Sequence, residues 1–570
     1  MIPSHIAGLL CTILFFSCAR QIPPTGGERD EQPPVLILSQ PENKSTNFAG
    51  QEILLEFDEY VKEDNLLKQL IITPRIEHGY KSRLVKKQLR LLFEQPFNDS
   101  TTYTLNFREG IKDITESNPA DNLNFVFSTG DFLDSLSIEG KVNNLLTGKP
   151  ANDVTVTLYL ANDTLDIFNS QPIYLAKTAE DGSYRIDNIK NGSYKIFASL
   201  DENQNLKTES QSESYGFKNV PINLQDSIVD LNIVIQHLDI RPIRILSARP
   251  VGSNFEIKFN KYITDYQLHY PESEIDLVGN LVDKNRTLRI YKSPMLSDSI
   301  KTTIQVTDST ETNLLDTLYV KFEESKRASE KPTLNVKPAN NEEIDPEFMG
   351  KLTFNKPVRH VINDSLFFEY DSTLITYVDP QKDIIWNENR TEANLTMVLD
   401  PTALAKSLEP IDQNDTLAGP PEQPKSKKKS NLRFYSGSGS FISIENDTFP
   451  SIERKYTFKK PENYGVIAGN ILSEKKSFVI QLIDKNQKII DTIISKHDAP
   501  LSNYRFISLK PGEYGFRILI DENHNGKWDP GNYFEQLEPE KIVFYTNPDD
   551  GGPTINLIQN WELTEIDLSF

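Results

Sequence analysis

Cysteine is the rarest residue type in this 570-residue chain, which contains only Cys11 and Cys18. Both lie within the first 18 residues, so the rest of the chain carries no thiol. That part therefore cannot form an internal disulfide bond, a thiolate metal site or a cysteine nucleophile. Its stability and its chemistry must come from other residue types.

Basic residues are also in deficit, with 61 Lys and Arg against 82 Asp and Glu, for a net charge of −21. A nucleic-acid-binding protein gains affinity when its basic side chains replace the counterions around phosphates, whereas an acidic surface repels phosphate. The composition therefore argues against nucleic acid as a partner. After residue 17, no apolar stretch approaches the ~18 residues that indicate a membrane-spanning helix.

Catalytic motifs are missing as well. The sequence has no H-E-x-x-H, no G-x-S-x-G and no phosphate-binding G-x-x-x-x-G-K-[ST] pattern. A pair of converging carboxylates, as in a glycosidase, stays open because any two of the 82 acidic residues can meet in a fold. The histidines after the amino-terminal region are each isolated in the sequence: His78, His237, His269, His360, His497 and His524. The sequence thus predicts a protein that is not an enzyme, with a hydrolase on a β scaffold as an alternative.

The amino terminus carries an apolar run. Residues 6–16 (IAGLLCTILFF) are too short for the ~20 residues of a spanning helix and match the core of a secretion signal. The following Ser17-Cys18 resembles the lipobox of bacterial lipoproteins, in which the signal is cut before a cysteine that then receives lipid. This resemblance implies a signal peptide at residues 1–17, lipidation of Cys18 and a membrane anchor. A simple secreted precursor and an uncleaved anchor remain as alternatives.

The segment after Cys18 is rich in Pro, Gly and charge, as its sequence ARQIPPTGGERDEQPP shows. Such a composition cannot bury a core. We therefore expect residues 18–32 to form a disordered tether that holds a folded body away from the membrane.

Past residue 33, apolar and polar residues alternate in short runs, as in Glu52-Ile53-Leu54-Leu55-Glu56-Phe57 and Tyr103-Thr104-Leu105-Asn106-Phe107. A two-residue period in strong β-formers is typical of half-buried strands. Long stretches of helical periodicity are absent from the sequence. We therefore predict an all-β protein, built as a string of antiparallel β-sandwich domains.

Two kinds of internal repeat divide the chain. A Phe-polar-polar-X-aliphatic corner occurs three times, as Phe57-Asp58-Glu59-Tyr60-Val61, Phe259-Asn260-Lys261-Tyr262-Ile263 and Phe354-Asn355-Lys356-Pro357-Val358. Separately, residues 184–205 (YRIDNIKNGSYKIFASLDENQN) match residues 504–525 (YRFISLKPGEYGFRILIDENHN) in register. Each copy of this second repeat predicts a strand, a Gly-containing turn, a strand and an acidic loop.

These residues resemble two known domain families. The first unit, with its corner motif, Ile111-Lys112-Asp113 and Phe125-Val126-Phe127-Ser128-Thr129-Gly130, resembles the immunoglobulin-like domain named after bacterial S-layer proteins. The second repeat, with Asp181-Gly182-Ser183-Tyr184 and Gly192-Ser193-Tyr194, is similar to the carboxypeptidase regulatory-like, prealbumin-type sandwich. Their order after a lipobox-like cysteine resembles a Bacteroidetes lipoprotein family with no established activity.

The repeats and resemblances together give the predicted domains. Immunoglobulin-like domains are expected at residues 33–130, 238–330 and 331–460, and prealbumin-like sandwiches at residues 131–237 and 461–570. Residues 419–431 (GPPEQPKSKKKSN) interrupt the third immunoglobulin-like domain. We expect a solvated Lys-rich loop there, with attraction to anionic lipid as the alternative.

The acidic loop of the second sandwich has the spacing of a calcium site. In residues 521–529 (DENHNGKWD), Asp521, Asn523, Asn525 and Asp529 place side-chain oxygens at positions 1, 3, 5 and 9, and Lys527 offers its backbone carbonyl at position 7. Position 12 is Asn532 in place of the usual glutamate, for which Glu535 or Glu538 would have to substitute. The alternative is an Asx-rich turn without metal.

The first sandwich carries a reduced copy of the same loop. Asp201, Asn203 and Asn205 keep positions 1, 3 and 5, but Leu206 replaces the glycine and Glu209 stands at position 9. This difference favours a structural or optional calcium ion over a catalytic one. Glycan binding is a further alternative, through stacking of sugar rings on Trp386, Trp528 or Trp561, although core packing explains these residues equally well.

The preferred hypothesis is a non-enzymatic, lipid-anchored protein of the cell envelope, held at the outer membrane on its periplasmic or its surface face. Its sandwiches would form a stalk or bind another envelope protein. The second hypothesis is a calcium-dependent or glycan-binding module, and the third is the hydrolase.

Overall fold

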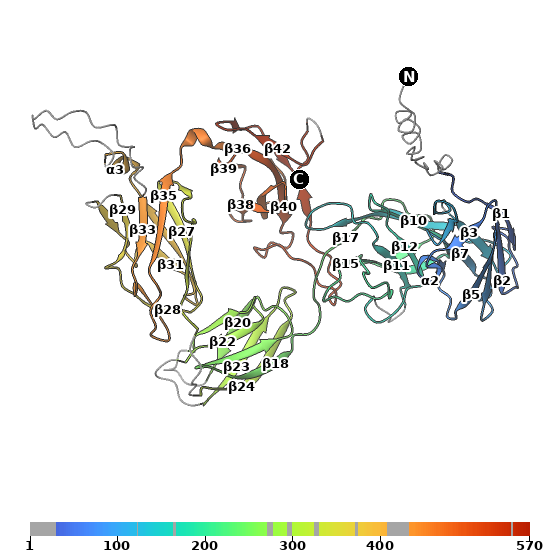
Figure 1. Cartoon of the computed structure of the whole chain (residues 1–570), viewed down its shortest axis with the longest axis horizontal. Coiled ribbons are helices and arrows are strands. Elements are labelled where there is room, and N and C mark those ends of the chain that lie inside the picture. The colour runs from blue at the N-terminus through green and yellow to red at the C-terminus, as the bar shows by residue number, and fades with distance from the viewer. Residues whose placement is uncertain are drawn as a thin grey trace, which may run out of the picture. The chain divides into compact units, whose positions relative to one another are not determined.

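The computed structural model describes residues 30–121, 123–162, 167–270, 277–292, 299–323, 330–370, 374–406, 432–548 and 551–570. The predicted signal peptide, Cys18, most of the tether and the Lys-rich segment 419–431 lie outside the described residues. The described part is built almost entirely from antiparallel β-sheets (Figure 1). This confirms the predicted all-β class and the string of β-sandwich domains.

The chain divides into two compact units. The first comprises residues up to Asn143, Pro150–Thr208 and Gly216–Ile235, and the second comprises Asn144–Lys149, Glu209–Tyr215 and Gln236–Phe570. The first unit contains two separate hydrophobic cores, and the second contains three. Each core lies within one of the five predicted domain ranges.

The first immunoglobulin-like domain places two sheets around its core. Strand β6 shows the reason, because Leu89, Leu91 and Phe93 point inward and are almost fully buried while the residues between them face outward. One sheet has the order β1-β2-β6-β5, a second has the order β4-β7-β9, and β3 pairs with β8. The bounds are β1 (Leu36–Gln40), β2 (Glu52–Phe57), β3 (Val61–Glu63), α2 (Leu66–Gln69), β4 (Ile71–Thr73), β5 (Tyr80–Val85), β6 (Gln88–Phe93), β7 (Thr102–Asn106), β8 (Ile111–Asp113) and β9 (Asn124–Ser128).

The domains at residues 238–330 and 331–460, predicted as the second and third immunoglobulin-like domains, repeat the order of the first sheet, as β18-β19-β22-β21 and β25-β27-β32-β31. Their other sheets are β20-β23-β24 in the second domain, and β26-β35-β33-β29-β30 with the β28-β34 pair in the third. The second domain contains β18 (Ile245–Val251), β19 (Asn254–Phe259), β20 (Asp265–His269), β21 (Gly279–Val282), β22 (Thr287–Ile290), β23 (Ser299–Thr307) and β24 (Asn313–Lys321). The third contains β25 (Leu334–Lys337), β26 (Glu343–Ile344), β27 (Glu347–Phe354), β28 (Val358–Val361), β29 (Leu366–Glu369), β30 (Ile375–Tyr377), β31 (Ile384–Trp386), β32 (Glu392–Val398), α3 (Pro401–Lys406), β33 (Leu432–Ser436), β34 (Phe441–Ser443) and β35 (Ile452–Phe458).

The two remaining sandwiches also share their strand order. The first has sheets β13-β10-β17 and β12-β11-β14-β15, and the second has β39-β36-β43 and β38-β37-β40-β41. The first contains β10 (Leu136–Asn144), β11 (Thr155–Leu160), β12 (Tyr174–Lys177), β13 (Ser183–Ile189), β14 (Gly192–Ser199), β15 (Tyr215–Phe217), β16 (Ile222–Leu224) and β17 (Ile233–Ile235). The second contains η2 (Pro461–Asn463), β36 (Gly465–Leu472), β37 (Phe478–Asp484), β38 (Ile489–Ser495), β39 (Asn503–Leu509), β40 (Gly512–Ile520), β41 (Ile542–Phe544), β42 (Ile555–Leu557), β43 (Glu562–Leu563) and β44 (Leu568–Ser569).

The likeness of these two sandwiches extends to single hydrogen bonds. The hydroxyl of Tyr184 donates to the carbonyl of Leu231 at 2.7 Å, and that of Tyr504, 320 residues later, donates to the carbonyl of Ile566 at 2.6 Å. In both copies a buried tyrosine thus ties one sheet to the chain that closes the domain.

The three-copy corner has one structural role throughout. The side chain of Asp58 accepts a hydrogen bond from the backbone N–H of Val35 at 2.8 Å. Asn260 accepts from the N–H of Arg244 at 2.8 Å, and Asn355 accepts from that of Thr333, also at 2.8 Å. In each case the corner residue fixes the chain segment that leads into the first strand, which is why this position requires a short side chain with an oxygen.

The residue that follows this Asp or Asn of the corner motif differs between the domains. Lys261 is 3% exposed, and its ammonium pairs with the buried carboxylate of Asp308 at 2.5 Å. Lys356 occupies the same motif position and pairs with Asp447 at 2.7 Å. In the first domain Glu59 stands there, and burial together with the nearby charge of Asp113 raises the pKa of its carboxyl. The first domain therefore lacks the buried cation that its sister domains use.

Replacing Lys261 with methionine should destabilise residues 238–330 by about 3–5 kcal/mol, because Asp308 would remain buried without its counter-charge. Hydrogen exchange followed by mass spectrometry on the full chain measures this domain separately from the others. Lys301→Met, at an exposed position of β23, is the matched control and should change protection little. Equal protection in the two variants would show that the buried ion pair contributes no net stability.

Candidate functional site

The acidic loop that the sequence singled out follows β40 directly. Asp521 is 3% exposed, and its carboxylate accepts hydrogen bonds from the Ser477 hydroxyl at 2.6 Å, the Asn525 N–H at 3.1 Å and the Gly526 N–H at 3.0 Å. Gly526 has φ +89°, a backbone conformation that residues with a Cβ rarely adopt. The loop is therefore wound around the first of its predicted metal ligands.

The other predicted side-chain ligands converge in the same loop. The amide groups of Asn523 and Asn525 both donate to Oδ2 of Asp529, at 2.5 Å and 2.8 Å. Asn525 also accepts from the backbone N–H of Lys527 at 3.0 Å, so the carbonyl predicted as a ligand lies in the same turn. The structure thus brings together the five residues that the spacing selected.

Glu540 is a member of this loop that the sequence did not reveal. It is 8% exposed, and its carboxylate accepts from the backbone N–H groups of Glu522 at 2.8 Å, Asn523 at 3.1 Å and Asp529 at 2.8 Å. The sequence proposed Glu535 or Glu538 as the substitute for the missing glutamate ligand of position 12, although both already lie beyond the 12 residues of a standard calcium loop. Glu540 follows only after a longer excursion of the chain, which no spacing rule covers.

The reduced copy in the first sandwich adopts the same turn. The carboxylate of Asp201 accepts from the N–H groups of Asn205 at 3.1 Å and Leu206 at 2.9 Å, and Asn205 accepts from the N–H of Lys207 at 2.7 Å. Glu213 is 2% exposed and accepts from the N–H of Glu209 at 2.8 Å, as Glu540 does from Asp529. Aligning the two repeats so that Glu213 matches Glu540 would therefore have predicted the part that Glu540 plays in the loop.

The charge of Asp521 is set by its hydrogen bonds. Burial acts to raise the pKa of this carboxyl, but the Ser477 hydroxyl and the backbone N–H groups of Gly526, Asn525 and His524 hold it below its usual value. An ionised carboxylate among amide and carbonyl oxygens is the kind of donor set that Ca²⁺ takes. Within the described ranges, no three His, Cys, Asp or Glu side chains are placed to hold a metal ion. Calcium at this loop, which would rest largely on Asn and carbonyl oxygens, stays a prediction.

Two histidines that are isolated in the sequence meet beside the loop. The ring centroids of His497 and His524 lie 4.6 Å apart with the planes tilted by 43°. Both line a cavity of about 390 Å³ together with Asp521, Asn525 and Gly526. Nothing in the sequence pairs these histidines, because His497 comes from the segment after β38.

The tryptophans considered for glycan stacking have different surroundings. Trp386 packs against Phe354 with ring centroids 5.4 Å apart, and the Nε1–H of Trp528 donates to the carbonyl of Glu540 at 3.0 Å. Trp561 is 51% exposed. Two of the three thus have structural contacts, and a stacking role for Trp561 stays a prediction.

No helix in the described ranges has both the length and the apolar character needed to cross a membrane.

Comparison with known proteins identifies the fold of the first domain. The bacterial Ig-like domain family (Big_5) matches residues 30–129, which confirms an immunoglobulin-like domain there. The match covers less than a fifth of the chain. No curated protein matches the chain.

Several solved structures give alignments at low identity. Domains 1–6 of the surface layer protein SbsC align at 10% identity, with 91% of this chain and 67% of that chain covered and a TM-score of 0.15. BcpA, the major pilin subunit of Bacillus cereus, aligns at 10% identity over 76% of this chain and 98% of that chain, with a TM-score of 0.13. A DUF3823 family protein from Bacteroides uniformis aligns at 12% identity over 33% of this chain and all of its own, with a TM-score of 0.13. TM-scores this low do not support a common overall arrangement.

If the loop at residues 521–529 binds calcium with the affinity of extracellular sites, 10 mM Ca²⁺ should stabilise residues 461–570 by about 1.4–2.7 kcal/mol. Hydrogen exchange of this segment, with Ca²⁺ and with EDTA, measures the effect on the full chain. Asp529→Asn should remove the response, whereas Glu513→Gln, an equal charge change at an exposed position of β40, should keep it. Unchanged protection and no heat of binding in calorimetry would leave the Asx turn without metal as the explanation.

Proposed function

We propose that the chain is a non-enzymatic, lipid-anchored protein of the cell envelope whose domains act as a scaffold and contact surface for another envelope protein. Lipid on Cys18 would hold it at the outer membrane, and residues 18–32 would separate the folded body from the bilayer. The chemistry of the anchor is favourable, because each buried CH₂ of an acyl chain contributes about 0.8 kcal/mol.

The observation that supports this proposal is that the same structural hydrogen bonds recur from domain to domain. Three corners share one hydrogen bond to the entering strand, and two sandwiches share their loops and their tyrosine contacts. What repeats is the scaffold of each domain. Such repetition is typical of modules that provide length and surface, and function then depends on what each surface presents.

One surface of the third immunoglobulin-like domain presents apolar residues to solvent. Met349 on β27 is 76% exposed and Val398 on β32 is 83% exposed. The pairing of Glu347 with Val398 and of Met349 with Thr396 places these two side chains in adjacent rows of the same sheet. Neighbouring large apolar groups on an outward face support contact with a protein partner.

The two cysteines allow a matched test of the anchor. In cells grown with labelled palmitate, Cys18→Ser should lose the label and leave the membrane fraction, whereas Cys11→Ser should keep both properties. Label retained by Cys18→Ser, or lost only in Cys11→Ser, would overturn the proposed anchor.

The contact surface is tested in the same cells. Crosslinking of the lipidated protein should yield a defined adduct, which Met349→Lys combined with Val398→Lys should weaken at unchanged protein level. Lys301→Met is the control and should leave the adduct intact. An adduct that the double variant forms as well as the wild type would move the contact away from this face.

A further inference from the structure

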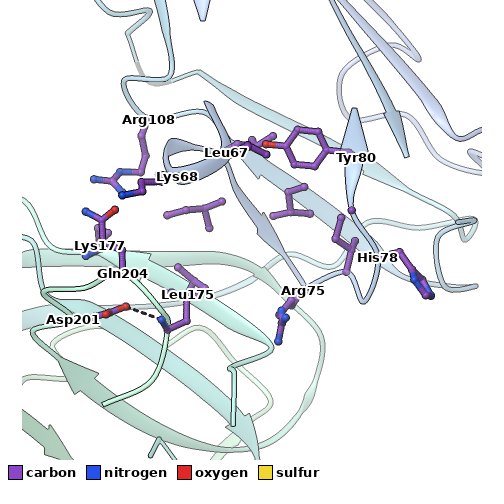
Figure 2. A pocket seen from close by; sticks show the side chains of 16 residues that line it. Leu67, Lys68, Arg75, His78, Tyr80, Arg108, Leu175, Lys177, Asp201 and Gln204 are labelled. Carbon is purple, nitrogen blue, oxygen red and sulfur yellow. Dashed lines mark hydrogen bonds between the residues drawn. The ribbon is translucent and has the colours of Figure 1, made fainter. Parts of the chain in front are cut away.

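The first compact unit contains a cavity of about 300 Å³ that no repeat or motif predicted. Its walls come from α2, β4 and the segment before β5 on one side, and from β12 and the loop after β14 on the other (Figure 2). The backbone N–H of Arg75 donates to the carbonyl of Ile173 at 2.8 Å, and Asn188 donates to the hydroxyl of Thr104 at 2.8 Å. These bonds join the two sides of the cavity.

Part of the lining is apolar, and one of its leucines is largely exposed to solvent. Leu66 of α2 is buried in the core of its domain, whereas its neighbour Leu67 is 80% exposed and faces the cavity. Across from it stand Leu175 and Leu206 (Figure 2 shows Leu67 and Leu175). Isoleucine and leucine side chains complete this wall: Leu70, Ile71, Ile72 and Ile76.

Four Lys and Arg side chains also line the cavity, against the acidic trend of the chain. Lys68, Arg75, Arg108, Lys177 and His78 line the cavity, and Figure 2 draws Arg108, Lys68 and Lys177 at one end and Arg75 and His78 at the other. The side chains of Lys68 and Arg75 have no hydrogen-bond or ion-pair partner within the described ranges. Converging cations in a partly enclosed site concentrate positive potential there.

Few acidic groups offset these cations. Asp201 is the only carboxylate in the lining, and the N–H groups of Asn205 and Leu206 occupy it. Asp153, outside the lining, lies 3.2 Å from the ammonium of Lys177 and 3.7 Å from the guanidinium of Arg108. The cavity therefore keeps an excess of positive charge.

Leu206 marks the cavity as a feature of the first sandwich alone. It adopts φ +58°, where its counterpart in the second sandwich is Gly526 at φ +89°. A residue with a Cβ in this conformation costs about 1–2 kcal/mol, so the leucine is retained against its backbone preference. Strand register gives a second difference, at Lys177. In the first sandwich Thr155 of β11 lies between Lys177 and Ser199. In the second sandwich the matching residue of β37, Val479, lies between Ile494 and Leu519, so an isoleucine stands where the first copy has Lys177. The first copy thus gains one apolar and one cationic group at this cavity.

We propose that this cavity binds a small amphipathic anion, an acyl carboxylate whose chain lies on Leu67, Leu175 and Leu206. The carboxylate would lie at the end formed by Arg108, Lys68 and Lys177, where Lys68 offers a charge-assisted hydrogen bond and the other two, which also contact Asp153, add positive charge. The volume is at the lower end of small-molecule sites, which span about 300–1,000 Å³. This site is independent of the proposed anchor and protein contact.

Calorimetry with octanoate tests the proposal on the full mature chain carrying Cys18→Ser, so that no detergent competes for the cavity. Octanoate should bind, 1-octanol should bind at least about tenfold more weakly for want of charge, and acetate should not bind for want of a chain. Equal affinity for octanoate and octanol, or no heat with octanoate, would overturn the proposal.

Three variants locate the site without breaking any described side-chain bond. Lys68→Gln should weaken octanoate binding by about three- to tenfold, and Leu67→Gln and Leu206→Gly by about tenfold each. Leu206→Gly also relieves the left-handed backbone, so weaker binding cannot be ascribed to unfolding, which hydrogen exchange would check. Lys301→Gln is the charge control and should bind as the wild type does. Wild-type affinity in all three cavity variants would place the ligand elsewhere.

Discussion

Buried carboxylates that accept backbone N–H groups are the interaction on which the rest of this structure depends. A fold with no cysteine beyond residue 18, and with little helix in its described part, must satisfy the amides of its loops where no strand ladder reaches them, and each unsatisfied buried group costs about 1–3 kcal/mol. Asp113 accepts from Glu116, Ser117 and Asn118, and Asp308 does the same for Thr310 and Thr312. The loops that follow β14 and β40 in the two repeated sandwiches are wound around an aspartate in the same way.

Because these aspartates hold the loop backbone, the side chains around them can differ from one domain to the next. Because backbone N–H groups hold the aspartate carboxylate, the side chain that lies near it can differ in charge between domains. Lys261 pairs with Asp308 in the second domain, whereas Glu59 stands at the same motif position near Asp113 in the first. The same freedom applies to the loop of the first sandwich, where Asp201 keeps its bonds while Leu206 and Gln204 face the cavity. New surface chemistry thus arises at positions that the frame does not use.

Sequence periodicity was sufficient for the fold class because a two-residue alternation is a direct record of which face of a sheet is buried. The repeat of residues 184–205 at 504–525 also foretold a common loop, since the hydrogen bonds of that loop are local. Glu540 could not be found in this way, because the excursion between it and Asp529 has no fixed length. The cavity was equally hidden, because its walls combine residues near 70, 108, 175 and 204, which only the tertiary fold brings together. The pairing of His497 with His524 has the same origin.

The separation of the five cores bears on how the chain responds to load. With no cysteine beyond residue 18, no disulfide there links one core to another, and contacts between the first two domains, such as the bond from the N–H of Arg75 to the carbonyl of Ile173, are noncovalent. One domain can then rupture while its neighbours stay folded, and each residue it releases adds about 3.3–3.6 Å of contour length. A domain of roughly one hundred residues, typical in size for its class, would therefore add several hundred ångströms of contour length when it unfolds, before the next domain unfolds. Unfolding of one domain would in this way lengthen the chain without breaking a covalent bond.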